Sequence, residues 1–309
     1  MGSRRTTGDS IARTLHGASV VFEPFHRAAV ACIQVWVRAG AARESDHERG
    51  TAHFLEHLLF QTRPDRFGGR GLGAVAEGGG GSANAWTSQD FTAVHVTCPA
   101  VSFDEAAAAV LHCVLAPDVA PDVLERERGV ILQEISREEE NPGLACTRAL
   151  FEERYAGHPY GRKVIGSRES VSSLGRDTIL GFHDRHYRTG NLLIAVAGDL
   201  APAGVFARLD AELRPLEREP VDLPPIPLAG LHRPGNRHVA RPTVESHFGL
   251  AFSIPHLEHP DVPAVDCLSG ILGDTRGSVL EEWRRTSGLV NEVSCVSYTP
   301  PHGGTLLIS

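Results

Sequence analysis

The chain has 309 residues, 41% hydrophobic and 22% charged, with a formal net charge of −8. This composition is ordinary for a globular protein with a sizeable core, and the length predicts about two domains. The negative charge gives no basic surface for nucleic acid. No apolar run reaches the roughly 18 residues that a membrane-spanning helix needs, so no role at a membrane is expected.

The cysteines and the N-terminal stretch bear on the cellular compartment. Six cysteines are scattered along the chain without a Cys-x-x-Cys pair. This usage fits reduced thiols better than a disulfide framework or a cysteine zinc site. The first 17 residues, MGSRRTTGDSIARTLHG, are basic but lack the apolar stretch of a secretory signal. We therefore expect a cytoplasmic protein.

Strand and helix patterns alternate irregularly through the first 200 residues. Val20 to Phe22 and Val30 to Val37 are rich in β-forming residues and predict strands. The glycine-rich stretch 64–81 superficially resembles a dinucleotide fingerprint, but no strand precedes it and no βαβ unit surrounds it, so we exclude that function. The further expected elements are helices at 50–61, 103–115, 121–141, 144–155, 176–186 and 205–213, a turn and strand at 83–98, and a strand at 191–197.

A proline-rich stretch separates this region from the remainder. Six prolines lie between positions 213 and 234, where few apolar residues recur periodically. Beyond it we expect strands at 244–253 and 305–308 and helices at 262–272 and 279–285. Mixed strands and helices without regular βαβ alternation predict an α+β fold. The predicted domains are 1–214 and 234–309, joined by a linker at 215–233.

The stretch from Gly50 to Phe60, GTAHFLEHLLF, carries the strongest chemical signal. On a helix, His53 and His57 lie one turn apart on the same face, so both imidazoles can reach one ion. Glu56 can lie beside that ion and take a proton from water. His-x-x-Glu-His is the inverzincin signature, and it suits zinc hydrolysis. A solvated polar helix face is the alternative, but the apolar flanks indicate burial, and buried polar groups need partners.

A catalytic zinc site needs a third protein ligand. The helix expected from Pro121 to Asn141 offers several glutamates. Glu127 and Glu134 lie two turns apart on one face, beside the apolar Val130 and Ile131. The helical pattern alone leaves both as candidates for the ligand.

Several segments, matching in order and spacing, resemble the pitrilysin family of inverted-zincin metallopeptidases, which includes insulin-degrading enzyme and the mitochondrial processing peptidases. The resemblance covers about residues 15 to 200. The segments that carry it are GTAHFLEHLLF from Gly50, NAWTS from Asn84, ERERGVILQEI from Glu125, HPYG from His158, HYRTGN from His186 and AGD from Ala197.

This resemblance implies a ligand set and a mechanism. Zn²⁺ would be held by His53, His57 and Glu134, with Glu56 as the general base. Glu127 matches the family's supporting carboxylate, which orients a ligand histidine or tunes the site. In the family, the strand corresponding to Asn84 and Ala85 receives the peptide substrate through main-chain hydrogen bonds.

The resemblance also implies a half-clamshell of two domains, each a mostly antiparallel sheet packed against helices. An arginine and a tyrosine from the second domain approach the zinc when the two halves of the enzyme close. Arg284 fits this pattern and would contact substrate, but Asn291 stands where the family has tyrosine. The 76 residues from position 234 onward are fewer than the family's second domain has. We expect that domain to be incomplete or completed by a homo- or heterodimeric partner subunit.

Two functions follow as hypotheses. The first is a zinc metalloendopeptidase that cleaves short or unfolded peptides, with a partner subunit completing its site. The second is a non-catalytic peptide-binding or scaffold subunit of a heteromeric peptidase, which Asn291 and the short second domain favour.

Overall fold

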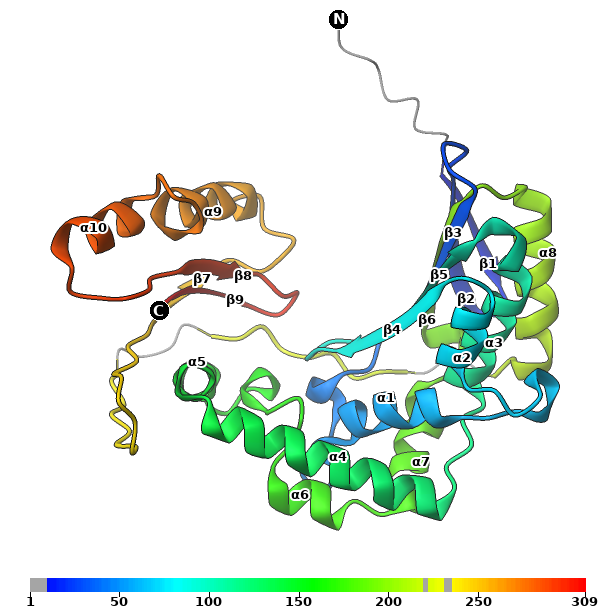
Figure 1. Cartoon of the computed structure of the whole chain (residues 1–309), viewed down its shortest axis with the longest axis horizontal. Coiled ribbons are helices and arrows are strands. Elements are labelled where there is room, and N and C mark those ends of the chain that lie inside the picture. The colour runs from blue at the N-terminus through cyan, green and yellow to red at the C-terminus, as the bar shows by residue number, and fades with distance from the viewer. Residues whose placement is uncertain (1–9, 219–221, 231–234) are drawn as a thin grey trace, which may run out of the picture. The chain divides into compact units, whose positions relative to one another are not determined.

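The computed structural model describes residues 10–218, 222–230 and 235–309 (Figure 1). Contacts divide the chain into two compact units: Met1–Gln133 with Val164–Leu223, and Glu134–Lys163 with Pro224–Ser309. We call them the first and the second unit. The domain boundaries predicted at 214 and 234 stay a prediction. Residues 219–221 and 231–233 of the predicted linker, and residues 1–9 of the basic N-terminal stretch, lie outside the described residues.

A six-stranded sheet forms the core of the first unit's described part, with strand order β1-β2-β6-β3-β5-β4. Neighbouring strands are antiparallel, except that β2 and β6 are parallel. The last strand in this order, β4, has one paired side and one open edge. The strands are β1 Ile11–Leu15, β2 Ala18–Pro24, β3 Val30–Val37, β4 Ser82–Thr87, β5 Thr92–Pro99 and β6 Leu192–Gly198.

Helices cover the apolar face of this sheet. Alternate residues of β3, such as Ile33 and Val35, are fully buried, which is the period of a strand with one enclosed face. α3 packs on β5 and on α8 (Figure 1). The helices with residues in this unit are α1 Thr51–Gln61, α2 Leu72–Gly78, α3 Phe103–Leu115, α4 Pro121–Glu140, α6 Arg168–Ser173, α7 Arg176–His186 and α8 Pro202–Leu213. α4 starts in the first unit and its last residues belong to the second.

The second unit has a smaller antiparallel sheet, whose three described strands run in the order β7-β9-β8. The hydroxyl of Tyr155, just after α5, donates to the Gly303 carbonyl at 2.8 Å, and the Arg154 guanidinium donates to the Gly304 carbonyl at 3.2 Å. These buried bonds tie α5 to the start of β9. The elements are α5 Pro142–Arg154, β7 Leu250–Ile254, α9 Val262–Ser269, α10 Val279–Ser287, β8 Cys295–Tyr298 and β9 Gly304–Ile308.

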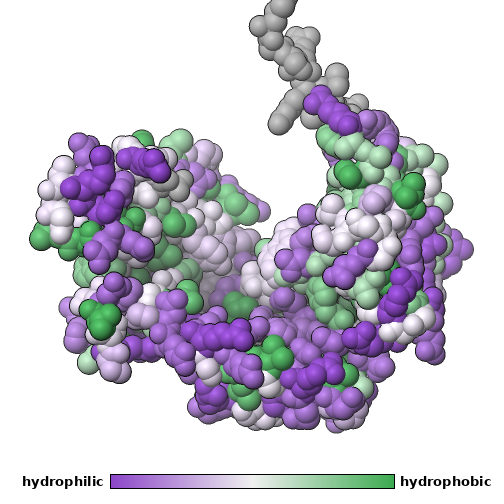
Figure 2. Space-filling view, viewed as in Figure 1, coloured by the Kyte–Doolittle hydropathy of each residue, from purple (hydrophilic) through white to green (hydrophobic). Residues whose placement is uncertain are grey.

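Large apolar side chains are exposed on the second unit. Hydrophobic residues are visible at its surface in the space-filling view, among hydrophilic ones (Figure 2). Phe248 is 74% exposed and Phe252, on β7, is 48% exposed. Others on α9, α10 and the segments that follow them are Leu268, Ile271, Val279, Trp283 and Leu289.

The α+β prediction is confirmed, while several element boundaries differ. The strand predicted from Val244 is wrong before Leu250, since Val244 is fully exposed and its segment pairs with no described strand. The helix predicted at 262–272 ends as α9 at Ser269 and continues as a π-turn over Gly270–Asp274. The stretch 83–98 contains two strands rather than one. Four elements without a prediction are β1, α2, α6 and β8.

Short 3₁₀ turns connect many of these elements, and none of the helices in the described ranges is long and apolar enough to cross a membrane. The 3₁₀ turns are Ala41–Arg43, Asp46–Glu48, Asp65–Phe67, Ala100–Ser102, Pro159–Gly161, Thr189–Asn191 and Arg214–Leu216.

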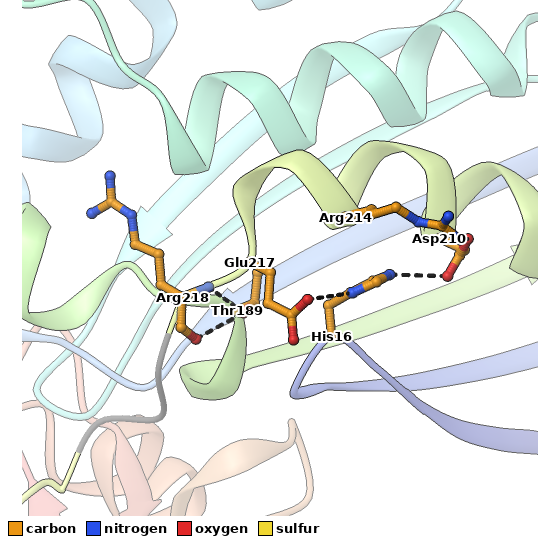
Figure 3. A network of polar contacts seen from close by, with 6 residues as sticks. All are labelled: His16, Thr189, Asp210, Arg214, Glu217 and Arg218. Carbon is orange, nitrogen blue, oxygen red and sulfur yellow. Dashed lines mark hydrogen bonds and ion pairs between the residues drawn. The ribbon is translucent and has the colours of Figure 1, made fainter.

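A two-residue turn of His16 and Gly17 joins β1 to β2. Both have positive φ, 48° and 85°, as a tight hairpin with right-handed strand twist requires. The His16 ring lies between two carboxylates, with Nε2 2.9 Å from Asp210 and Nδ1 2.8 Å from Glu217 (Figure 3). Bonds to Glu217 and then Asp210 raise the pKa of His16. The turn is thereby tied to the C-terminal end of α8 and the residues after it.

Candidate metal centre

The start of α1 is fixed by a buried carboxylate. Glu44 accepts hydrogen bonds from the backbone N–H groups of Gly50 at 2.9 Å and Ala52 at 2.8 Å. Two N–H groups at the N-terminus of α1, which the helix itself cannot satisfy, thus find an acceptor. Gly50 has φ 90°, and a Cβ there would lie 3.0 Å from the Ile165 carbonyl oxygen. Glycine is therefore required where the chain enters α1, one turn before His53.

His53, His57 and Glu134 come together. One ligand atom from each lies within 4.8 Å of the others, and all three side chains are partly buried. The two imidazole centroids are 4.9 Å apart. Across the described residues, no other group of three His, Cys, Asp or Glu side chains has the spacing to hold a metal ion. α1 supplies both histidines from one face, and α4 supplies the glutamate.

The donor set and its protonation fit zinc. Two imidazole nitrogens and one carboxylate oxygen are the donors of a catalytic zinc site that keeps a fourth position for water. Burial, and then the neighbouring His57, lower the pKa of His53 to about 4. At neutral pH the imidazole is therefore uncharged, which is the form that binds a metal ion.

Glu127 lies beside the cluster and contacts His57. Its side chain is buried, with Oε2 3.4 Å from Nδ1 of His57 and Oε1 3.4 Å from Nε of Arg126. A carboxylate at Nδ1 favours the tautomer that leaves the lone pair on Nε2 for a metal. The structure therefore distinguishes two glutamates that the helical pattern left equivalent. Glu134 lies with the two histidines, whereas Glu127 contacts Nδ1 of His57.

Glu56 lies on α1 between the two histidines in sequence and contacts β4. The Thr87 hydroxyl donates to Oε2 of Glu56 at 2.5 Å. We did not predict Thr87 as a site residue. It stands three residues after Asn84 in the same NAWTS segment, but only the register of β4 brings it to α1.

Asn84 and Ala85 lie in the middle of β4, which has an open edge in the described sheet. The backbone N–H of Ala85 donates to the Asn84 side-chain oxygen at 2.9 Å. Trp86 follows, with its ring 5.2 Å from that of Trp36 and perpendicular to it. The Asn84 side chain thus satisfies the Ala85 N–H on a strand with an open edge. Capping a backbone donor in this way protects the edge from pairing with another strand.

Two family models match consecutive parts of the chain. Residues 19–168 match the model of the insulinase peptidase family M16, and residues 173–308 match that of the peptidase M16 inactive domain. The two ranges together cover most of the sequence. The chain belongs to the peptidase M16 family. The resemblance to pitrilysin and the processing peptidases inferred from the motifs is thereby confirmed.

Curated relatives of this M16 chain are named as zinc proteases or processing peptidase subunits. An uncharacterized zinc protease of Mycobacterium tuberculosis is 31% identical over 290 residues, which cover 90% of this chain and 64% of the relative. The beta subunit of the mitochondrial-processing peptidase of Caenorhabditis elegans is 30% identical over 168 residues, 54% of this chain and 36% of that subunit. The chain spans about 64% of the length of the Mycobacterium bovis and M. tuberculosis relatives.

Solved structures share the fold. A peptidase M16 inactive domain from Pseudomonas fluorescens has a TM-score of 0.89 at 22% identity, covering 97% of this chain and 73% of that one. A protease from Helicobacter pylori has a TM-score of 0.86 at 24% identity, covering 97% and 74%. Pitrilysin has a TM-score of 0.73 at 18% identity, covering 100% and 34%.

Arg284 of this M16 chain lies on α10 in the second unit. Its guanidinium makes two 2.7 Å bonds to the Glu281 carboxylate, one turn earlier, and donates to the Asn291 carbonyl at 3.1 Å. Asn291, which replaces the family's tyrosine, therefore contacts Arg284 through its backbone. The substrate-binding role of Arg284 stays a prediction.

Proposed function

We propose that the chain is a zinc-dependent metallopeptidase that hydrolyses peptide bonds in short or unfolded peptides. The observation that carries the proposal is the group of His53, His57 and Glu134, with Glu56 on α1 beside the two histidines. The zinc-protease name of the Mycobacterium tuberculosis relative supports it.

The chemistry divides between the metal and one carboxylate. Zinc held by His53, His57 and Glu134 would supply a Lewis acid that lowers the pKa of water and polarises the scissile carbonyl. Glu56 would accept the proton of the attacking water and deliver it to the leaving amine, so the carboxylate returns to its starting state. Glu127, through its contact with Nδ1 of His57, would hold that ring in its ligand orientation.

The open edge of β4 would bind the substrate as an added strand. Asn84 would release the Ala85 N–H to a carbonyl of the peptide, so main-chain bonds replace a local one. Such pairing requires an extended backbone and reads little side-chain identity. It therefore favours short or unfolded peptides over folded proteins.

A partner subunit is part of the proposal. The developing oxyanion needs a donor besides the metal, and Arg284 is the candidate within this chain. Asn291 cannot supply a phenolic hydroxyl, so a second family subunit that carries a tyrosine at this position would complete the site. The mitochondrial-processing peptidase relative is itself named as a subunit, which supports a heteromer.

All six cysteines are free thiols, which supports a reducing compartment such as the cytoplasm.

Metal content and cleavage of a mixed peptide pool test the proposal. We expect one zinc per chain, loss of that zinc in Glu134→Gln, and retained zinc with at least about a 100-fold loss of cleavage in Glu56→Gln. Glu140→Gln, an exposed change at the end of the same helix as Glu134, is the matched control and leaves both unchanged. Absence of zinc from the purified protein, or undiminished cleavage by Glu56→Gln, would rule the proposal out.

The second candidate is a non-catalytic peptide-binding subunit, which Asn291 favours. Peptides would then bind without being cut, both alone and beside a co-expressed family subunit. If cleavage appears with that subunit and disappears in Glu56→Gln, this chain supplies the catalytic base, and the non-catalytic candidate is excluded.

A further inference from the structure

One hydrogen bond joins the strand proposed to bind substrate to the proposed base. Thr87 is the last residue of β4, and its hydroxyl oxygen lies 2.5 Å from Oε2 of Glu56 in the middle of α1. Thr87 is only partly exposed, so water is partly excluded from this hydrogen bond. Neither residue is a metal ligand in the proposal.

The neighbouring polar groups fix the direction of this bond. An ionised carboxylate can only accept, so Thr87 is the donor. Thr92, its register partner on β5, is fully buried and donates its own proton to the Ala39 carbonyl at 2.9 Å. The two threonine oxygens are 3.5 Å apart. Thr92 directs its own proton to Ala39, so towards Thr87 it could only accept, and at 3.5 Å it is the weaker acceptor. The single proton of Thr87 therefore goes to Glu56, at 2.5 Å.

We propose that Thr87 is a positioning residue for the general base: its hydroxyl holds the Glu56 carboxylate through Oε2 in the orientation that accepts the proton of water. This inference rests on the proposed function. A glutamate has three rotatable side-chain bonds, so a contact that fixes one carboxylate oxygen narrows the orientations that the base adopts, and a narrower set favours the rate.

Through this bond, the strand proposed to bind the substrate also positions the proposed base. Asn84 and Ala85 lie on the strand that ends at Thr87, so a peptide paired with β4 is registered on the element that holds Glu56. A displacement of β4 on binding would move Thr87, and the carboxylate would follow it. The effect of Thr87 should therefore fall on the chemical step rather than on peptide affinity.

Steady-state kinetics of the zinc-loaded protein test this. Thr87→Val keeps the shape and removes the hydroxyl, and we expect kcat to fall about 10-fold or more with KM and zinc content unchanged. Thr87→Ser keeps the hydroxyl and should restore kcat to within about threefold. Thr97→Val, an exposed threonine on β5, is the matched control and should not change kcat. If Thr87→Val does not fold, Thr87→Ala takes its place.

Carboxyl carbon-13 NMR of the metal-free protein gives a readout that needs no activity. The Glu56 resonance is the one lost in Glu56→Gln. It should shift in Thr87→Val and return in Thr87→Ser. A wild-type protein that binds no zinc or cuts no peptide defeats the proposed function, yet this resonance still decides whether Thr87 holds Glu56. An unmoved resonance, or an unchanged kcat in an active Thr87→Val enzyme, overturns the inference.

Discussion

The two units bury their apolar residues to very different extents. In the first unit, strands and helices enclose side chains such as Phe22, Ile33 and Leu58 completely. In the second, Phe252 on β7 and Trp283 on α10 remain about half exposed. Burial of apolar area is the main favourable contribution to folding. Among the described residues, most of this contribution therefore comes from the core of the first unit.

This difference matters for the proposed chemistry. A hydrolytic site needs side chains held to within fractions of an ångström, and such precision comes from packed surroundings. α1, with both histidines, lies in the unit whose core is enclosed. The proposed partner subunit would cover apolar residues that the second unit exposes.

Matched phenylalanine substitutions would break the comparison most directly. Phe22→Ala removes a fully buried ring that meets Phe206 edge-on, and we expect a loss of about 3–5 kcal/mol in the free energy of unfolding. Phe252→Ala should cost about 1 kcal/mol or less, because water already reaches half of that ring. Urea unfolding followed by the fluorescence of Trp36 and Trp86 for the first unit, and of Trp283 for the second, measures both. Equal losses would contradict the comparison.

Acid should destabilise the first unit through buried histidines. Burial lowers the pKa of His183 to about 4, and its Nε2 bonds the Val114 carbonyl at 2.8 Å. The unfolded chain binds a proton near pH 6.5 and the folded chain only near pH 4, so stability is full above pH 6.5 and falls between these values. The loss is about 3 kcal/mol for this histidine. Burial lowers the pKa of His186 to about 4 as well.

The measurement is the unfolding free energy at pH 7, 6 and 5. His183→Gln keeps a side-chain donor for Val114 and removes the titrating ring, so its pH slope should be shallower than that of the wild type. An identical slope in the variant would show that His183 does not set the acid sensitivity.

Zinc should sharpen the comparison by stabilising the structure around α1. At a free concentration about 100 times its dissociation constant, a ligand that binds only the folded state adds about 2.7 kcal/mol. We expect this gain in unfolding followed by Trp36 and Trp86, and its loss in His53→Ala. Glu140→Gln should keep it. A gain that survives in His53→Ala would place the metal elsewhere.

The smallest expected effect concerns the His16 turn. His16→Asn retains a residue that tolerates positive φ but cannot carry charge. Because the pKa of His16 is raised, its contribution is present below pH 6.5 and is lost as pH rises through the higher folded value. The wild type should thus exceed the variant in stability at pH 5.5 and approach it at pH 9. A difference that grows with pH would mean that the carboxylates do not favour the charged ring.

The sequence predicted those elements whose defining pattern lies within their own residues. The expected helices at 103–115 and 176–186 coincide with α3 and α7, because in each case apolar periodicity, an acidic first turn and at least one basic residue in the last turn lie in one stretch. β8 has four residues and exists through pairing with β9. Such a strand depends on contacts that its own sequence does not specify.

The candidate site likewise has residues that local sequence predicts and residues that only the contacts between distant segments reveal. His53 and His57 were predictable because four residues on a helix fix their proximity. Glu127 and Glu134 share a helix face, so their different positions depend on how α4 lies beside α1. Thr87 could not be predicted, since its contact with Glu56 requires the register of β4 on β5 as well as the place of α1.

The strand order carries a consequence for synthesis. Among the described strands, β1 and β2 join the rest of the first sheet only through β6, where Ser19 lies beside Leu193. A nascent chain that has not yet delivered residue 198 from the ribosome can fold the hairpin and the β3-β5-β4 ladder only as separate pieces. Joining such distant segments is slow and leaves apolar strand faces uncovered meanwhile. Chaperone dependence during translation should therefore end when β6 emerges, well after α1 with His53 and His57 has been made.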